Sequence, residues 1–286
     1  MKGRLIGLFA GWILLVCCSL FTPPIHPTPI PPADTAAALP SSPPADAEVQ
    51  PWRPEKGISW QIQFSGEIDL TVEADLFDLD LFETDAETVA ELQGRGKKVI
   101  CYLNAGAWED WRPDADRFPP EVIGRDYEGW EGEKWLDIRQ LDALAPVLRA
   151  RLDLCASKGF DGVDPDNIDG YTNPTGFPLT YDDQLAFNRW LSQEAHRRGL
   201  AIGLKNDPEQ AADLADDFDW VLSEDCFAEG WCADFQPFLD AGKAVLAIEY
   251  TDRVQSLEPF CEQARSLGIS LILKNRNLDS YRQTCL

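Results

Sequence analysis

The chain has 286 residues and a formal net charge of -24 at neutral pH. Nucleic acid and anionic membrane surfaces are poor partners for so acidic a protein, whereas a cationic substrate would be attracted to it; solubility alone would also account for the charge. Only two histidines are present, His26 and His196, and neither lies at the end of a predicted strand. This excludes a Ser-His-Asp or Cys-His catalytic site and a histidine-rich zinc site.

Residues 1–21 have the pattern of a targeting segment. Lys2 and Arg4 form a short basic start, and the run that follows is almost entirely apolar. The run is long for a signal-peptide core and short for a membrane span, so it favours either a signal peptide or an N-terminal membrane anchor. Cys17 and Cys18 add lipid anchoring as another route. We expect a secreted or cell-surface protein and confine any membrane attachment to the N-terminus.

Residues 22–55 are rich in proline, alanine and serine, as in "TPPIHPTPIPP". Such a composition cannot bury a core and prefers extended, solvated conformations, so it predicts a disordered linker. Residues 56–286 remain, which is enough for one domain with a large core.

Within this domain, strand-like apolar runs alternate with amphipathic stretches that begin with acids and end at glycine. Eight strands are predicted, over 58–64, 74–82, 98–104, 159–166, 200–207, 218–225, 243–250 and 269–275. Helices are predicted over 85–96, 141–159 and 181–199, with shorter ones over 208–217 and 259–268. Eight such units predict a (β/α)8 barrel of the α/β class. The competing fold is a doubly wound open sheet, but this sequence has no glycine-rich phosphate-binding turn after the first predicted strand.

Nearly every predicted strand ends in polar residues. In chain order these are Gln61 and Gln63, Asp78 and Asp80, Tyr102 and Asn104, Asp164 and Asp166, Lys205 with Asn206 and Asp207, Glu224 and Asp225, Glu249 and Tyr250, and Lys274 and Asn275. The carboxyl ends of barrel strands meet at one rim, where barrel enzymes place their chemistry. We therefore expect a functional site there.

The stretch "GFDGVDPDNIDGY" carries four aspartates behind an apolar run. Asp164 and Asp166 are two residues apart on a predicted strand, so they share a face and point toward the rim. Asp161 has the other parity and is expected to face a helix, and Asp169 is expected to order the following turn. The spacing is one residue off an EF-hand loop and lacks its closing glutamate, although a metal held by acids from several strand ends stays an alternative.

Acid chemistry in this chain therefore depends on Asp and Glu. Paired carboxylates, one protonated and one ionised, are the equipment of glycoside hydrolysis. Aromatic side chains commonly line sugar subsites, and either that role or core packing fits the tryptophans near predicted strand ends and loops, which are Trp60, Trp108, Trp111, Trp130, Trp135 and Trp231.

Six cysteines follow the leader, namely Cys101, Cys155, Cys226, Cys232, Cys261 and Cys285. An even number in an exported protein favours disulfide bonds. Cys226 and Cys232 are close enough in sequence to close a small loop. For Cys101 and Cys155, buried thiols are an equally good interpretation.

Several segments together resemble the endo-α-1,4-polygalactosaminidases, glycoside hydrolase family 114. They are "KKVICYLNAGAWEDWRPD", "GEKWLDIRQ", "GFDGVDPDNIDGY", "GLKND", "SEDCFAEGWC" and "GKAVLAIEYTD", in order and with family-like spacing over residues 60–252. The resemblance implies a (β/α)8 barrel, a secreted or surface location, and hydrolysis within α-1,4-linked galactosamine-containing polymers. Such a polymer is cationic when deacetylated, so an acidic rim would attract it. We expect no required cofactor.

The resemblance also implies a catalytic pair, carried over to Asp166 in "PDN" as nucleophile and Glu224 in "SEDC" as acid/base. Asp164 stands where the family usually has glutamate, which would recess that carboxylate. Together with the other strand-end residues, the expected substrate-binding or tuning set is Asp80, Tyr102, Asp164, Asn167, Lys205, Asn206, Asp207, Glu249 and Tyr250. Two alternatives are a non-catalytic carbohydrate-binding barrel and a metal-dependent hydrolase that uses the strand-end carboxylates.

Overall fold

The computed structural model describes residues 52–285, so the predicted leader and most of the predicted linker lie outside the described residues. The last linker residues pack against the domain. Arg53 Nε lies 2.7 Å from Asp219 Oδ1, and Pro54 is buried. The packed part of the chain therefore begins before residue 56, the predicted domain boundary. No helix within 52–285 combines the length and apolar character needed to cross a bilayer.

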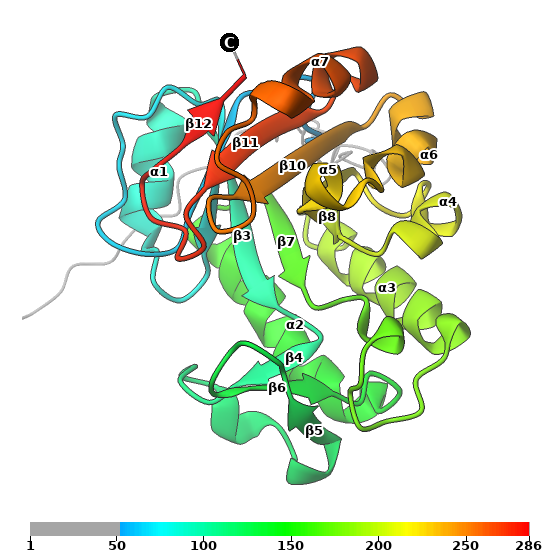
Figure 1. Cartoon of the computed structure of the whole chain (residues 1–286). Coiled ribbons are helices and arrows are strands. Elements are labelled where there is room, and N and C mark those ends of the chain that lie inside the picture. Colours follow the sequence, from blue (N-terminus) through cyan, green and yellow to red (C-terminus); the bar gives the residue numbers. More distant parts are fainter. Residues whose placement is uncertain (1–51, 286) are drawn as a thin grey trace, which may run out of the picture. The chain divides into compact units, whose positions relative to one another are not determined.

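The centre of the domain is a sheet of eight parallel strands (Figure 1). In sheet order they are β1 (Trp60–Gln63), β2 (Leu76–Asp80), β3 (Lys98–Asn104), β7 (Gly162–Asp166), β8 (Ala201–Lys205), β9 (Trp220–Glu224), β10 (Ala244–Tyr250) and β11 (Ser270–Lys274). Each strand falls inside a predicted one. The sheet order follows the chain order, as expected when right-handed crossovers wind a barrel.

The first and last parallel strands are joined by side chains. Trp60 Nε1 donates to Ser270 O at 2.9 Å, and Lys274 Nζ donates to Gln61 Oε1 at 3.0 Å. A short strand, β12 (Gln283–Thr284), adds antiparallel to β11. The predicted (β/α)8 architecture is confirmed, with β1 and β11 meeting through side-chain contacts where a backbone ladder would close an ideal barrel.

Helices surround the strands (Figure 1), and their ends follow the predicted signals. They are α1 (Ala86–Gly94), α2 (Leu141–Lys158), α3 (Tyr181–His196), α4 (Ala211–Leu214), α5 (Cys226–Glu229), α6 (Gln236–Asp240) and α7 (Glu258–Leu267). Asp85 Oδ1 accepts from Thr88 N at 2.8 Å and so caps α1. Thr180 and Asp183 form a capping box at α3, and Gly159 ends α2 with a φ of 88°. Such caps typically contribute about 1 kcal/mol each.

Several features of the fold were not predicted, among them the short helices α5 and α6 and the strand β12. Residues 64–75 lead from β1 to β2 without a helix. After β3 the chain forms an antiparallel sheet of β4 (Ala107–Glu109), β5 (Ile123–Asp126) and β6 (Glu133–Leu136), in the order β4-β6-β5. Figure 1 shows this inserted sheet beyond the ends of β3 and β7, where it extends one side of the rim.

Apolar side chains fill the interior of the barrel. Trp220 is the bulkiest of those that β9 provides. Trp220 is fully buried and occupies the space above two glycines. A Cβ atom on Gly203 would lie 2.3 Å from Trp220 Nε1, and one on Gly162 would lie 2.9 Å from the indole carbons. Since a Cβ cannot approach this closely, glycine at both positions lets one large side chain close the floor beneath the rim.

Three disulfides tie the domain together. They join Cys101 in β3 to Cys155 in α2, Cys226 to Cys232 after β9, and Cys261 in α7 to Cys285 beside β12. The predicted small loop is confirmed. For Cys101 and Cys155, the structure shows a disulfide and not the alternative of two buried thiols.

Candidate active site

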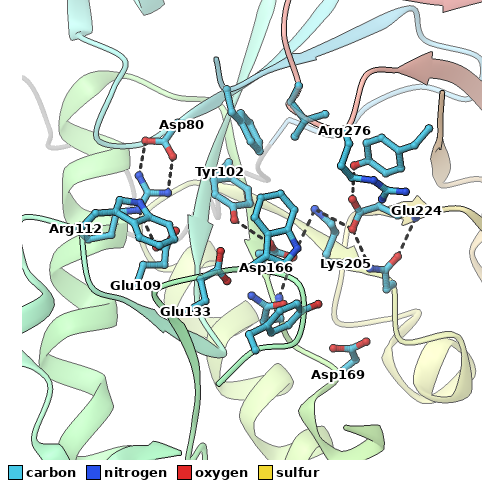
Figure 2. Close-up of a pocket in the computed structure, with 18 of the residues that line it drawn as sticks. Asp80, Tyr102, Glu109, Arg112, Glu133, Asp166, Asp169, Lys205, Glu224 and Arg276 are labelled. Atoms are coloured by element: carbon cyan, nitrogen blue, oxygen red, sulfur yellow. Dashed lines mark hydrogen bonds and ion pairs between the residues drawn. The ribbon is translucent and has the colours of Figure 1, made fainter. Parts of the chain in front are cut away.

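A cavity of about 370 Å³ opens at the carboxyl ends of the strands, at the predicted rim. One wall comes from strand ends of the barrel and the other from the inserted sheet and its loops (Figure 2). Eight carboxyl side chains and three basic ones line it. The lining therefore carries an excess of acidic over basic side chains, which favours a cationic ligand.

Asp166, the last residue of β7, lies near the centre of the cavity (Figure 2). Its Oδ2 accepts from the Tyr102 hydroxyl at 2.8 Å, and its Oδ1 accepts from Asn167 N at 3.0 Å. Burial, and then the charge of Asp166, raise the pKa of Tyr102 well above its usual value. The hydroxyl thus stays protonated and keeps donating to the carboxylate.

Glu224, the last residue of β9, has an equivalent environment. Tyr250 donates its hydroxyl to Oε1, and Asn206 Nδ2 donates to Oε2 at 3.3 Å. Burial alone would raise the pKa of Glu224, but the Lys205 charge and these two hydrogen bonds lower it below its usual value. Glu224 is therefore held ionised in the protein without substrate.

Lys205, at the end of β8, joins these two acids. Its Nζ lies 3.1 Å from Asp164 Oδ2, 3.6 Å from Asp166 Oδ1 and 3.9 Å from Glu224 Oε2. Burial would lower the pKa of Lys205, but the surrounding carboxylates raise it well above its usual value, with Asp164 contributing most. One permanent cation thus holds both predicted catalytic acids in a common field.

The backbone turns sharply just after each of these three strand ends. Asn167, Asn206 and Asp225, which follow Asp166, Lys205 and Glu224, have φ values of 61°, 53° and 56°. Asn and Asp tolerate this left-handed region better than other non-glycine residues. Such strained positions concentrate at functional sites, where the surrounding structure holds them in place.

The inserted sheet is anchored to the rim by one arginine. Arg112 forms a two-nitrogen contact with Asp80, at 2.7 Å and 2.9 Å, and its Nε donates to Glu109 Oε2 at 2.8 Å. Asp80 was predicted to bind substrate, and it does line the cavity. Its charge is already neutralised by Arg112, so in this structure it fastens the insert to β2.

Two other cavity acids have no cationic partner among the described residues. Glu133, on β6, is nine-tenths buried, and Asn104 Nδ2 donates a long hydrogen bond of 3.4 Å to its Oε2. Burial first, and then the charge of Asp166, raise the pKa of Glu133 to about 8 and that of Asp169 to about 7. Figure 2 shows both acids beside Asp166, facing the cavity. They are the natural positions for an incoming positive charge.

The tryptophans divide between the cavity and the core. Trp111 and Trp130, both on the insert, line the cavity and are 51% and 49% exposed. Large exposed aromatic faces beside a polar cavity suit stacking against a sugar ring. Trp60 and Trp135 are buried, while Trp108 and Trp231 pack partly against the apolar core.

Most of the predicted site residues come together in this cavity. Its lining includes Asp80, Tyr102, Asp166, Asn167, Lys205, Asn206, Glu224 and Tyr250. Asp164 does not line it, because it is fully buried beneath Lys205. Asp164 and Asp166 do share a face, as parity predicted, but only Asp166 is high enough on the strand to reach the opening.

Asp207 and Glu249 also lie away from the cavity lining. Asp207 is buried against Tyr171 and Asn188, where it accepts at 3.2 Å and 3.1 Å. Glu249 is fully buried and accepts from Phe227 N at 2.8 Å. Both acids hold neighbouring segments in place, and neither is available to a ligand in the cavity.

Several cavity residues were missed by the sequence analysis. They are Phe64, Glu83, Glu109, Arg112, Tyr127, Glu133, Arg276 and Leu278, while Asp169 had been given a turn-ordering role. Most come from the insert or from loops, for which strand-end reasoning has no rule. Asp169 carried one signal, since it follows the Asp166 strand end by three residues. Across residues 52–285, no three His, Cys, Asp or Glu side chains are grouped as a metal site.

Comparison with known proteins gives one family. The sequence profile of glycoside-hydrolase family GH114 matches residues 41–286. The crystal structure of Aspergillus fumigatus Ega3 in complex with galactosamine is 37% identical to this chain, with a TM-score of 0.79. The match covers 83% of this chain and 98% of the Ega3 chain.

Two more distant proteins are similar over comparable lengths. The glycoside hydrolase domain of PelA from Pseudomonas aeruginosa has a TM-score of 0.63 at 17% identity, covering 79% of this chain and 98% of that domain, which is a likeness of fold. A protein of Deinococcus radiodurans, described as uncharacterized, is 27% identical over 284 residues, which is 87% of this chain and 88% of that protein.

Proposed function

This chain belongs to glycoside hydrolase family GH114, and we propose that it is an exported enzyme that cleaves α-1,4-linked, galactosamine-containing polysaccharide within the chain. The observation that carries the proposal is the pairing of Asp166 and Glu224 around Lys205 in a carboxylate-rich cavity. Since both acids contact one nitrogen, Asp166 Oδ1 and Glu224 Oε2 are at most about 7.5 Å apart, an upper bound that admits the roughly 5 Å spacing of retaining glycosidases and the shorter part of the roughly 6.5–9.5 Å spacing of inverting ones.

In the proposed reaction, Asp166 attacks the anomeric carbon as the glycosidic bond breaks. Glu224 gives its proton to the departing oxygen, so the leaving sugar is released as an alcohol and a glycosyl ester forms on Asp166. Glu224 then takes a proton from water, and the resulting hydroxide displaces Asp166 from the anomeric carbon. Two displacements predict net retention of the anomeric configuration.

The environment of the pair sets a condition on this assignment. Tyr102 donates a hydrogen bond to Asp166 and so restricts the orientation of the nucleophilic carboxylate. Glu224 has a lowered pKa, so its protonated form, which the first step needs, is populated in acidic solution. The proposed enzyme therefore works best under acidic conditions.

The unneutralised acids of the cavity support an amino-sugar substrate. A free galactosamine unit carries an ammonium group near neutral pH, and Glu133 and Asp169 lie within the cavity without a cation of their own. Binding the ammonium there would favour the ionised forms of both acids, because a nearby positive charge lowers their raised pKa values. Ega3, which is similar over most of this chain, was crystallised with galactosamine. Trp111 and Trp130 would provide apolar surface for neighbouring sugar rings.

Export is supported by the disulfides. Three are present within residues 52–285, and disulfides persist mainly outside the cytoplasm. The predicted signal peptide or N-terminal anchor would provide the route, with membrane attachment limited to that end of the chain.

The proposal is tested with purified full-length chain and α-1,4-galactosamine polymers of graded N-acetylation. Release of reducing ends should rise as the acetylated fraction falls, and it should weaken as salt is added, because salt screens the attraction between the polymer and the acidic cavity. Neutral α-1,4-glucan serves as the matched control. Equal cleavage of fully acetylated and deacetylated polymer at every salt concentration would overturn the amino-sugar assignment.

A further inference from the structure

Three carboxyl oxygens without donors lie together in the protein interior, behind the Lys205 side chain that lines the cavity. Asp78 from β2 and Asp164 from β7 are both fully buried, and their carboxyl groups are within hydrogen-bonding reach of each other. Both oxygens of Asp78 and Oδ1 of Asp164 have no donor in the described part of the chain. Two carboxylates cannot hydrogen-bond to each other, and burying both as anions would be strongly unfavourable.

We propose that Asp78 and Asp164 share one proton in the folded protein, with Asp78 as the neutral carboxylic acid donating to Asp164 Oδ1, and that this proton positions the Lys205 cluster. A single proton gives a partner to one oxygen on each side chain. It also turns an adjacent pair of buried anions into one anion and one neutral donor, as in other carboxyl dyads that hold a proton between them.

The contacts decide which side chain carries the proton. Lys205 Nζ donates to Asp164 Oδ2 at 3.1 Å and so stabilises Asp164 as the anion. Asp78 has no cation in hydrogen-bond contact within residues 52–285. Burial, and then the Asp164 charge, raise the pKa of Asp78 well above its usual value, whereas Lys205 offsets part of the burial and leaves the pKa of Asp164 at about 6.

The charges that act most strongly on this pair belong to the catalytic cluster. They are Asp166 from β7, Lys205 from β8 and Glu224 from β9, with Tyr102 from β3 and Tyr250 from β10 beside Lys205, while β1 contributes the apolar Ile62. With Asp78 neutral, Lys205 balances three carboxylates instead of four. The hydrogen bond from Asp78 reduces the negative charge on Asp164. The positive charge of Lys205 is then offset less by Asp164 and attracts Asp166 and Glu224 more strongly.

Asp78 is therefore a positioning residue that acts on the reaction through Asp164 and Lys205. Its effect on catalysis rests on the proposed function, since it works through the proposed catalytic pair. The proton itself does not, because it belongs to the folded protein with or without substrate.

The proton is tested without activity by comparing the wild type with Asp78→Asn, whose amide can donate in place of the acid. The pKa of Asp78 is raised in the folded state, so the wild type loses stability as pH rises from the unfolded value toward the folded one. Between pH 5 and 7, we expect the wild-type unfolding constant in urea to rise tenfold per pH unit relative to that of Asp78→Asn. The infrared difference spectrum of wild type minus Asp78→Asn at pH 7 should contain a protonated-acid C=O band from Asp78, because the bands of other protonated acids such as Glu133 cancel.

The matched control is Asp161→Asn, immediately before β7, the strand of Asp164. Asp161 lies 2.7 Å from Lys98 Nζ, away from the pair, so the difference spectrum of wild type minus that variant should lack the band. Parallel unfolding constants for the wild type and Asp78→Asn, or a difference spectrum that lacks the Asp78 band, would overturn the shared proton. These readouts hold even for a protein that cleaves no polymer, so they separate this inference from the proposed function.

The positioning role is tested by the pH profile of kcat/KM. Asp164→Asn removes an anion beside the pair, so both limbs of the profile should move about one unit toward lower pH. Asp78→Ala should lower kcat at least tenfold with little change in KM, and Asp78→Asn should restore most of the loss, because the amide donates the same hydrogen bond. A profile that stays in place in Asp164→Asn, or an Asp78→Asn enzyme as slow as Asp78→Ala, would overturn the role.

Discussion

Asp166 and Glu224 contact the same ammonium nitrogen, at 3.6 Å and 3.9 Å from Lys205 Nζ. Each acid also accepts a hydrogen bond from the hydroxyl of a buried tyrosine, Tyr102 for Asp166 and Tyr250 for Glu224. The two environments resemble each other, yet they come from different strands. This arrangement gives a single cation control over both proposed catalytic groups.

Replacing that cation should cost stability as well as activity. Lys205→Met leaves buried carboxylates without their partner, so we expect the free energy of unfolding to fall by about 3–5 kcal/mol. Lys98→Met is the matched control, because Lys98 pairs with Asp161 immediately before β7 but has a side chain that is 38% exposed. Its loss should cost about 1 kcal/mol or less. Urea unfolding followed by fluorescence measures both, and equal losses would contradict the role of Lys205.

The pH dependence of kcat/KM should identify the proton donor. The pKa of Glu224 is lowered, so a donor at this position loses its proton as pH rises past a value below the usual glutamate value of about 4.3. Activity should then decline about tenfold per pH unit above that point. A decline that begins near pH 8 would instead match Glu133, whose pKa is about 8, and would contradict the assignment of Glu224.

Binding of a galactosamine oligomer at pH 7 should release protons. Glu133 and Asp169 have pKa values of about 8 and 7, so at this pH Glu133 is mostly protonated and Asp169 is about half protonated in the free protein. An ammonium group beside them lowers their pKa values and expels those protons. Calorimetry in buffers of different ionisation enthalpy counts them. The N-acetylated oligomer is the control, since it has no charge, and Glu133→Gln should reduce the release.

The disulfides should contribute unequally to stability. Cys101 and Cys155 are separated by 54 residues in sequence, and loop-closure entropy assigns such a bridge about 4 kcal/mol. The separation of 6 residues between Cys226 and Cys232 corresponds to about 2 kcal/mol. Paired Cys→Ala variants compared by urea unfolding measure the difference. A larger loss for the short loop would show that strain or packing outweighs chain entropy.

The sequence predicted the barrel well because its strands carry strong local signals. Each of the eight apolar runs contains one strand, and helix ends fell where acids and glycines indicated. The inserted sheet was missed because its strands are three or four residues long, as in Ala107–Glu109. Strands this short have no clear periodicity, and they form here because the rim and Arg112 hold them.

The site was predicted in part, for two physical reasons. Parity places a side chain on a face but does not say how far along the strand the cavity begins, so Asp164 was expected at the rim where only Asp166 reaches it. For Glu249 a usable signal existed. It alternates with Ile248 and Tyr250, which belong to the barrel interior, so its own side chain had to face the outer layer.

The most direct test of the account compares Asp166→Asn and Glu224→Gln with the wild type on deacetylated α-1,4-galactosamine polymer. Both changes keep the size of the side chain and remove its acid, and thermal unfolding checks that each variant folds. We expect each to lower kcat by at least about a thousandfold, and the double variant to be little slower than either single one, because the two acids act as a unit. Cleavage at the wild-type rate by both folded variants would contradict the account.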